Sequence, residues 1–285
     1  MKRGGCDLHT HSVYSDGTLT PQELIKEAER IGLSAVALTD HNTMSGMNEF
    51  LTAAAQSTVE GIAGVELSTD YDKIELHIVG LFIKPEHFAE VETFVEELDR
   101  RKMESNVRLV ENLQKGGYDI SFKELLECTP NGYINRAHFA TELVKKGYVK
   151  TRQEAFDTLL SKEGGFYEEP KKLPVFETIA FLKKIGGVAV LAHPFLSLTE
   201  QELRGFLPKA KEYGLDGMET VYSTYDEGTT LLAKRIAREY NIKESGGSDF
   251  HGGNKPDIML GSGRGSLFIP DSFAKNLKES IKLGS

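Results

Sequence analysis

The sequence predicts an α/β protein with a mostly parallel sheet, either open or closed into a barrel. Short apolar runs alternate with amphipathic stretches of helical period, an alternation typical of parallel α/β folds. A central stretch lacks strand candidates and has a charged helical pattern instead, which predicts a helical insertion. With 285 residues, the chain is long enough for roughly one to two domains and a sizeable core.

Six segments predict buried strands because they are short apolar runs, several of them directly after glycines or turns. They cover residues 6–9, 33–39, 61–67, 74–79, 187–192 and 217–221. A further strand is expected at 266–269, after the glycine-rich loop 261–265. That loop lacks the spacing of a dinucleotide-binding fingerprint, so we predict no dinucleotide site there.

The helices between these strands are indicated by apolar stripes and by end signals. The clearest start is Thr20-Pro21-Gln22-Glu23. Thr20 is the expected N-cap, Pro21 takes the first helical position and Glu23 completes a capping box. Gly32 ends that helix. Similar helical patterns cover about 175–185, 199–213 and 226–240.

The middle of the chain breaks this rhythm. One long charged helical pattern is followed by three short helical patterns, at about 86–116, 121–127, 137–146 and 151–161. We therefore predict three regions: the first part of the α/β body at 1–99, a helical insertion that caps it at 100–171, and the second part at 172–285. The alternative is a set of ordinary surface helices that share no separate core.

The composition is that of an ordinary globular protein and argues against several functional classes. No apolar run approaches the ~20 residues needed to cross a bilayer, and no apolar segment of a secretory signal follows the basic N-terminus. Two cysteines cannot build a disulfide framework. A net charge of −9, from 34 Lys+Arg and 43 Asp+Glu, disfavours duplex DNA as a partner. We expect a cytoplasmic protein without membrane contact, as a monomer or small homo-oligomer.

The most informative feature is the position of the histidines. Five of the eight lie at or just beyond the C-terminal end of a predicted strand: His9, His11, His41, His193 and His251. Active sites of parallel α/β sheets and barrels are built at that end. His9 and His11 share one face if the strand continues that far, because side chains alternate with a period of two.

Carboxylates accompany these histidines. Asp16 follows in a turn, Asp40 precedes His41, Glu66 ends a predicted strand, and Asp249 precedes His251 by two residues. Singly, each has an ordinary structural explanation: Asp40 as a helix cap, or Asp249 as a turn residue. Together with His77 they form a set that suits Mn, Fe or Zn better than Ca. Without Asp40, these are six histidines and three carboxylates, which are too many for one ion, so we predict two or three divalent ions.

These residues lie in motifs that resemble those of the polymerase and histidinol phosphatase (PHP) superfamily of metal-dependent phosphoesterases. The motifs are Asp7-Leu8-His9-Thr10-His11-Ser12, Ser15-Asp16-Gly17, Leu38-Thr39-Asp40-His41-Asn42-Thr43, Gly64-Val65-Glu66-Leu67-Ser68, Glu75-Leu76-His77, Ala192-His193-Pro194 and Gly247-Ser248-Asp249-Phe250-His251. The resemblance implies the PHP fold, a distorted (β/α)7 TIM-like barrel, with a trinuclear metal centre at the C-terminal ends of its strands.

When the ligand pattern of the family is transferred to this sequence motif by motif, the resemblance implies three sets of metal ligands. The first ion would be held by His9, His11, Glu66 and Asp249. Glu66 would bridge to a second ion held with His77 and His193, and a third would be held by Asp16, His41 and His251. Mn²⁺ is the expected ion, with Fe²⁺, Zn²⁺ or Mg²⁺ as alternatives. Some family members have His where this chain has Asp16, which lowers the positive charge of the third site.

The predicted insertion carries a further motif, Asn135-Arg136-Ala137-His138-Phe139-Ala140. It resembles an Arg-x-His-x-Ala motif of one PHP branch, which includes a 3′,5′-nucleoside bisphosphate phosphatase. The resemblance implies that Arg136 and His138 hold a substrate phosphate, and Arg at a helix N-terminus suits an anion. The alternative is that Arg136 pairs with a surface carboxylate and His138 packs. Asn42 is a further candidate for phosphate binding, and we assign His87 no role.

The expected reaction is hydrolysis of a phosphate monoester by a hydroxide that bridges the first two ions. Asp40 and His193 are the candidate acids for the leaving group, or supporting residues behind the ligands. The expected substrate is the 3′-phosphate of a 3′,5′-nucleoside bisphosphate, with trimming of the 5′ end of short RNA as a related activity. The alternatives are a histidinol-phosphate or cyclic-phosphate hydrolase of the same fold, or a catalytically silent metal-binding module.

Overall fold

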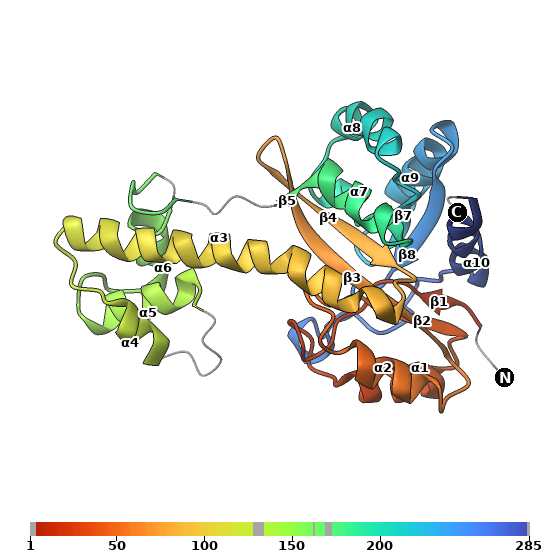
Figure 1. Cartoon of the computed structure of the whole chain (residues 1–285), viewed down its shortest axis with the longest axis horizontal. Coiled ribbons are helices and arrows are strands. Elements are labelled where there is room, and N and C mark those ends of the chain that lie inside the picture. Colours follow the sequence, from red (N-terminus) through yellow and green to blue (C-terminus); the bar gives the residue numbers. More distant parts are fainter. Residues whose placement is uncertain (1–3, 128–133, 162, 169–172, 284–285) are drawn as a thin grey trace. The chain divides into compact units, whose positions relative to one another are not determined.

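A computed structural model describes residues 4–127, 134–161, 163–168 and 173–283. The chain divides into two compact units, Met1–Val95 with Leu173–Ser285, and Glu96–Lys172 (Figure 1). The boundary between them falls within one long helix, α3 (Phe88–Lys115). The first unit contains the sheet and all the strand-end histidines.

The sheet of the first unit has a nearly closed barrel shape. Its main path is, in order, β1 (Cys6–Asp7), β2 (Ala35–Leu38), β3 (Glu60–Tyr71), β4 (Ile74–Leu81), β6 (Val188–Leu191), β7 (Gly217–Tyr222) and β8 (Lys243–Gly247), with β5 (Leu173–Pro174) paired to β3. Beyond β1 and β8, the two ends of the path meet: His11 N–H donates to the Phe250 carbonyl and Asp249 N–H to the His9 carbonyl, both at 2.9 Å. The predicted α/β barrel is confirmed.

One strand departs from the parallel pattern. β4 runs antiparallel to both of its neighbours, β3 and β6, because it follows β3 directly through a tight turn at Asp72 and Lys73, which both have positive φ angles of 49° and 74°. The start of β4 therefore lies beside the C-terminal end of β3. This reversal decides where His77 is placed.

Helices connect and cover the strands. Those of the first unit are α1 (Pro21–Ile31), α2 (Met47–Ala54), α7 (Val175–Lys184), α8 (Glu200–Glu212), α9 (Glu227–Glu239) and α10 (Asp271–Glu279), with single 3₁₀ turns at Pro85–His87, Pro194–Leu196, Gly252–Asn254 and Ser280–Leu283. The predicted start of α1 is confirmed: Thr20 and Glu23 form the capping box, and Gly32 ends the helix in the left-handed region at φ 78°. The sequence did not indicate α2 or α10.

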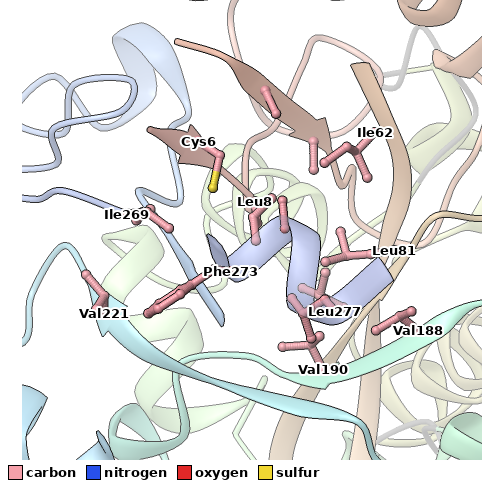
Figure 2. Packing of buried hydrophobic residues seen from close by; sticks show 14 of the residues in the cluster. Cys6, Leu8, Ile62, Leu81, Val188, Val190, Val221, Ile269, Phe273 and Leu277 are labelled. Atoms are coloured by element: carbon pink, nitrogen blue, oxygen red, sulfur yellow. The ribbon is translucent and has the colours of Figure 1, made fainter. Parts of the chain in front are cut away.

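The barrel has an apolar core of buried side chains from the strands and from α10. It joins the first residues of several strands, including Cys6, Ala35 and Val188, to the side chains of Phe273 and Leu277 on α10 (Figure 2). Burial of these side chains stabilises the barrel by about 25 cal/mol for each Å² of apolar surface removed from water.

The expected strand at 266–269 is wrong. These residues form no ladder; one hydrogen bond, from Cys6 N–H to the Ile269 carbonyl at 2.9 Å, ties them to β1. Ile269 nevertheless belongs to the core. Leu267 and Ile269 are thus buried although the segment forms no ladder, while Phe268 is exposed. Pro270 after it cannot donate to a neighbouring strand.

The second unit is helical. Besides the later turns of α3, it contains α4 (Phe122–Glu127), α5 (Arg136–Lys145) and α6 (Arg152–Thr158). These helices share a core of their own that includes Leu109, Leu113, Phe139, Leu143 and Leu160. Asn135 caps α5 by accepting a hydrogen bond from Ala137 N–H at 3.0 Å.

Candidate metal centre

The loops that follow three parallel strands deliver most of the strand-end histidines. His9 and His11 follow β1, His41 follows β2, and Asp249 and His251 follow β8. These positions adjoin because Thr10 pairs with Phe250 and His41 pairs with Glu66 in isolated parallel bridges. The C-terminal ends of parallel strands share one edge, so side chains far apart in sequence converge here.

His77 and His193 belong to the same cluster, but different backbone features place them there. His77 lies opposite Ser68 on β3, which the antiparallel course of β4 makes possible. His193 follows β6 with φ 27° and ψ 53°, a backbone conformation that is uncommon for a residue with a side chain. Asp249 also has a positive φ, of 56°. Two of the convergent side chains therefore depend on strained backbone.

All nine predicted ligands fall into groups whose donor atoms lie within 4.8 Å of one another. The groups are His9, His11 and Asp249; His9, Glu66 and His193; His41, Glu66 and His77; and His11, Asp16, His41 and His251. Glu66 and three histidines belong to more than one group, as expected where ligands surround several ions.

Glu66 stands at the centre of this cluster. Its Oε2 lies 3.1 Å from His9 Nε2 and 3.0 Å from His41 Nδ1, and its Oε1 lies 2.7 Å from His77 Nδ1. Separations near 3 Å are those of adjacent ligand atoms that each lie ~2.1 Å from a shared ion. Burial raises the pKa of Glu66, but His9 and His77 outweigh it and hold this pKa well below its usual range.

Buried donor atoms that face one another without a hydrogen bond indicate that the cluster fits metal ions. Nε2 of His9, Nε2 of His11 and Oε2 of Glu66 are buried and make no hydrogen bond within the described part of the chain. Such atoms are costly unless a partner satisfies them. All three are donor atoms that bind divalent transition metals, and they converge on common points. The residues present therefore fit a group of divalent cations.

The protonation of the cluster follows from its burial and its carboxylates. Burial lowers the pKa of His11 to about 3, so that imidazole is neutral. Burial also acts to lower the pKa of His77, but Glu66 dominates and raises it to about 9. At Asp16, burial is outweighed by His251 and His41, and the pKa falls to about 2. In the absence of metal, the positive charge of protonated histidines therefore offsets the negative charge of the carboxylates.

Asp40 holds the loop that carries Asp16. Its Oδ1 accepts hydrogen bonds from Ser12 N–H at 2.7 Å and Ser15 Oγ at 2.6 Å, and its Oδ2 accepts from Ser12 Oγ at 2.6 Å. Burial raises the pKa of Asp40. Its carboxylate is thus engaged with the backbone and hydroxyls of the 12–15 segment.

Three supporting residues escaped the sequence analysis. Glu219 on β7 contacts His9 and the backbone of His193, while Tyr222 and Lys255 contact Asp249. Glu219 had a usable signal, because an acidic residue inside an apolar strand must find a buried partner. Tyr222 and Lys255 had none, since both residue types are common at strand ends and in loops.

The predicted phosphate-binding residues lie in two places. Asn42 is in the first unit, where its Oδ1 accepts from Ser68 N–H at 3.0 Å and its Nδ2 donates to Ser68 Oγ at 3.3 Å. Arg136 and His138 are on α5 in the second unit. Arg136 Nη1 donates to the Leu160 carbonyl at 3.2 Å, and its guanidinium lies 4.4 Å from the Tyr167 ring centre. His138 Nδ1 accepts from Asn135 N–H at 3.1 Å.

The side chain of Arg136 also lines a cavity of about 240 Å³ within the helical unit, together with Lys102, Ser105, Asn106, Asn135 and Tyr167. Arg136 has no carboxylate partner among the described residues. A guanidinium that borders a cavity without a neutralising carboxylate attracts anions.

Comparison with known proteins decides the family. The PHP domain family matches residues 7–168, which is more than half of the 285 residues. The chain belongs to the PHP family. This PHP protein is 31% identical over 246 residues to a 5′-3′ exoribonuclease of Haemophilus influenzae, and the alignment covers 86% of this chain and 89% of the relative.

Two further relatives agree. A 3′,5′-nucleoside bisphosphate phosphatase of Chromobacterium violaceum is 30% identical over 251 residues, which cover 86% of each chain. A solved structure from Bifidobacterium adolescentis, described as a metal-dependent phosphoesterase, has a TM-score of 0.71 at 27% identity and covers 98% of this chain and 96% of its own. The PHP protein is therefore a metal-dependent phosphoesterase, a hydrolase of phosphoric ester bonds. None of the helices described is long and apolar enough to pass through a membrane.

Proposed function

We propose that this PHP protein hydrolyses the 3′-phosphate of a 3′,5′-nucleoside bisphosphate and, as a related activity, trims the 5′ end of short RNA. The nine clustered residues would hold two to three divalent ions, Mn²⁺ first. The observation that carries the proposal is the convergence around Glu66 of buried Nε2 and Oε2 atoms that form no hydrogen bond within the described part of the chain. The two relatives named as a bisphosphate phosphatase and an exoribonuclease support the choice of substrate.

Bound divalent ions would supply a water of lowered pKa and polarise the phosphoryl oxygens. The chain's own residues provide the rest. Glu66 contacts histidines that come from β1, β2, β4 and β6 and would hold them in position. Asp40 fixes the 12–15 loop and with it Asp16. The hydrogen bonds of Asp40 favour a supporting role over that of leaving-group acid. His193, the other candidate acid, is counted among the nine residues that would hold the ions, so we assign the proton donor to neither.

The helical insertion predicted at residues 100–171, which falls within the second unit, Glu96–Lys172, would serve as the cap that recognises the substrate. We propose that Arg136 and His138 bind a phosphate remote from the reacting one, since Arg136 borders a cavity and faces no carboxylate within the described residues. Asn42 keeps one amide hydrogen for the same purpose. Local cations of this kind allow a chain with a net charge of −9 to bind a small phosphate ester, although not duplex DNA.

A substrate screen tests the proposal. Purified protein with Mn²⁺ is incubated with nucleoside bisphosphates, sugar phosphates, histidinol phosphate, cyclic phosphates and short oligonucleotides, and released phosphate or nucleotide is measured. We expect the bisphosphates and the short RNA to be hydrolysed and Glu66→Gln to be inactive. Release from neither class would refute the proposal, and turnover of histidinol phosphate or cyclic phosphates alone would establish the corresponding alternative. Bound ions without any turnover would identify a silent module.

We further propose a cytoplasmic protein that acts as a monomer or small homo-oligomer. Two cysteines and the absence of a disulfide framework support that compartment. Fractionation of cells and light scattering of the purified protein test the two statements.

A further inference from the structure

Glu219 lies in the middle of β7, and its side chain is almost fully buried, at 2% exposure. Both carboxylate oxygens are engaged. Oε1 lies 3.0 Å from Nδ1 of His9, and Oε2 accepts a hydrogen bond from the backbone N–H of His193 at 2.7 Å. One buried carboxylate thus connects the segments after β1 and β6, which are 184 residues apart in sequence (His9 to His193).

The contact with His9 fixes the tautomer of that imidazole. A carboxylate can only accept a hydrogen bond, so Nδ1 of His9 must carry the proton. Nε2 then keeps its lone pair in the neutral ring. This is the nitrogen that is buried without a hydrogen bond and lies 3.1 Å from Glu66 Oε2. Glu219 therefore prepares His9 Nε2 to bind a cation.

The contact of Glu219 with His193 involves the backbone N–H of His193 and not its ring. His193 has the uncommon φ of 27°, which surrounding contacts must stabilise. The hydrogen bond to Glu219 holds its N–H in that conformation and keeps the ring 3.1 Å from Glu66 Oε1. Because both oxygens of Glu219 are occupied in this way, Glu219 supports ligands and is not itself one.

We infer that Glu219 is a positioning residue for two metal ligands at once: it sets the tautomer of His9 and the backbone of His193. The inference rests on the proposed ligand roles of those two histidines. Carboxylate partners of metal-bound histidines typically raise metal affinity about 10- to 100-fold.

The substitution Glu219→Gln separates the two contacts. Its amide oxygen can still accept from His193 N–H, but its NH₂ group faces His9 Nδ1 and donates to it. That donation moves the ring proton to Nε2 and removes the lone pair. We therefore expect Glu219→Gln to lose one bound ion, or to weaken it about 10- to 100-fold, while the remaining ions stay bound.

The readouts are elemental analysis of bound Mn²⁺ and titration of the metal-free protein with Mn²⁺, with circular dichroism as the check on folding. Glu244→Gln is the matched control: Glu244 lies on the adjacent β8 and accepts a hydrogen bond from Thr220 Oγ1 at 3.0 Å. We expect Glu244→Gln to bind Mn²⁺ as the wild type does. Equal Mn²⁺ stoichiometry and affinity in Glu219→Gln and the wild type would overturn the inference.

A second measurement needs no variant at Glu219. In histidine-selective ¹⁵N NMR of the Zn²⁺-loaded wild type, we expect His9 to carry its proton on Nδ1, with the signal assigned by its loss in His9→Gln. A proton on Nε2 would contradict the inference. Neither experiment uses a substrate, so a failure of the proposed nucleotide hydrolysis leaves the result intact, and an unchanged Glu219→Gln leaves the proposed hydrolysis intact.

Discussion

The hydroxyl of Tyr222 donates a hydrogen bond to Oδ2 of Asp249 at 2.6 Å, and Lys255 Nζ lies 2.8 Å from the same oxygen. The other oxygen, Oδ1, faces His11 Nε2 at 3.2 Å. Two donors from outside the cluster thus engage Oδ2, so that Oδ1 alone faces the clustered histidines. Burial and the neighbouring Asp249 raise the pKa of Tyr222 far above its usual value, so the phenol remains a donor at every working pH.

Tyr222→Phe removes one of these donors without changing the volume of the side chain much. We expect the variant to fold, to bind Mn²⁺ several-fold more weakly and to lose about 10-fold in kcat, because Asp249 gains freedom to rotate. Tyr225→Phe is the control, since its hydroxyl accepts from Phe195 N–H and contacts none of the nine clustered residues in the described contacts. Equal Mn²⁺ affinity in both variants would show that Tyr222 does not orient Asp249.

Asp40→Ala tests the role of the 12–15 loop. The substitution leaves Ser12 N–H without its acceptor, which costs about 1–3 kcal/mol in free energy of unfolding. We expect urea denaturation of the metal-free protein to show this loss, and elemental analysis to show one ion fewer, because Asp16 is no longer held near His251. Asp257→Ala, which breaks an exposed pair with Arg264, should change neither quantity. Full ion content in Asp40→Ala would remove Asp40 from the support of the site.

Arg136→Ala tests substrate recognition by the helical unit. We expect KM for nucleoside bisphosphates to rise about 10- to 100-fold, as for a lost charge-assisted contact, with Mn²⁺ content unchanged. Arg152 lies at the exposed start of α6. Arg152→Ala is therefore the control for the loss of one positive charge elsewhere in the helical unit. A KM equal to the wild-type value would exclude Arg136 from the substrate site.

The metal-free protein should lose stability on the alkaline side through His77. Its pKa is raised from 6.5 to about 9 in the folded state, so its contribution is complete below pH 6.5 and disappears as the pH rises through 9. The gap in free energy of unfolding between wild type and His77→Gln should therefore shrink over that range, by about 3 kcal/mol at most.

Urea denaturation in the presence of EDTA at pH 6, 7.5 and 9 measures this gap. His87→Gln serves as a comparison, because His87 is a more exposed residue paired with Glu90 on the same helical segment. A gap between wild type and His77→Gln that stays constant with pH would contradict the raised pKa of His77.

The sequence predicted the nine residues that cluster, but not the way in which all of them are brought together. His9, His11 and His41 could be placed because each follows a parallel strand, and such strands end at one edge. His77 could not be placed by that rule, since nothing in the local pattern of Ile74–Leu81 distinguishes an antiparallel strand from a parallel one. The strand predicted at 266–269 is absent for another reason. An apolar run can indicate that side chains are buried, but it does not show that the backbone pairs with a neighbouring strand.

The antiparallel β3–β4 hairpin also has a consequence for how the metal centre forms as the chain folds. Glu66 and His77 are 11 residues apart in sequence, so a local hairpin is enough to bring them together. The contact of His11 with Asp249 joins the two ends of the sheet path and therefore requires closure of the whole barrel, as does the pairing of Thr10 with Phe250. Loop-closure entropy grows with the length of the loop. The hairpin alone would therefore place two of the candidate donor groups side by side before the barrel closes, whereas the complete cluster would have to wait for closure.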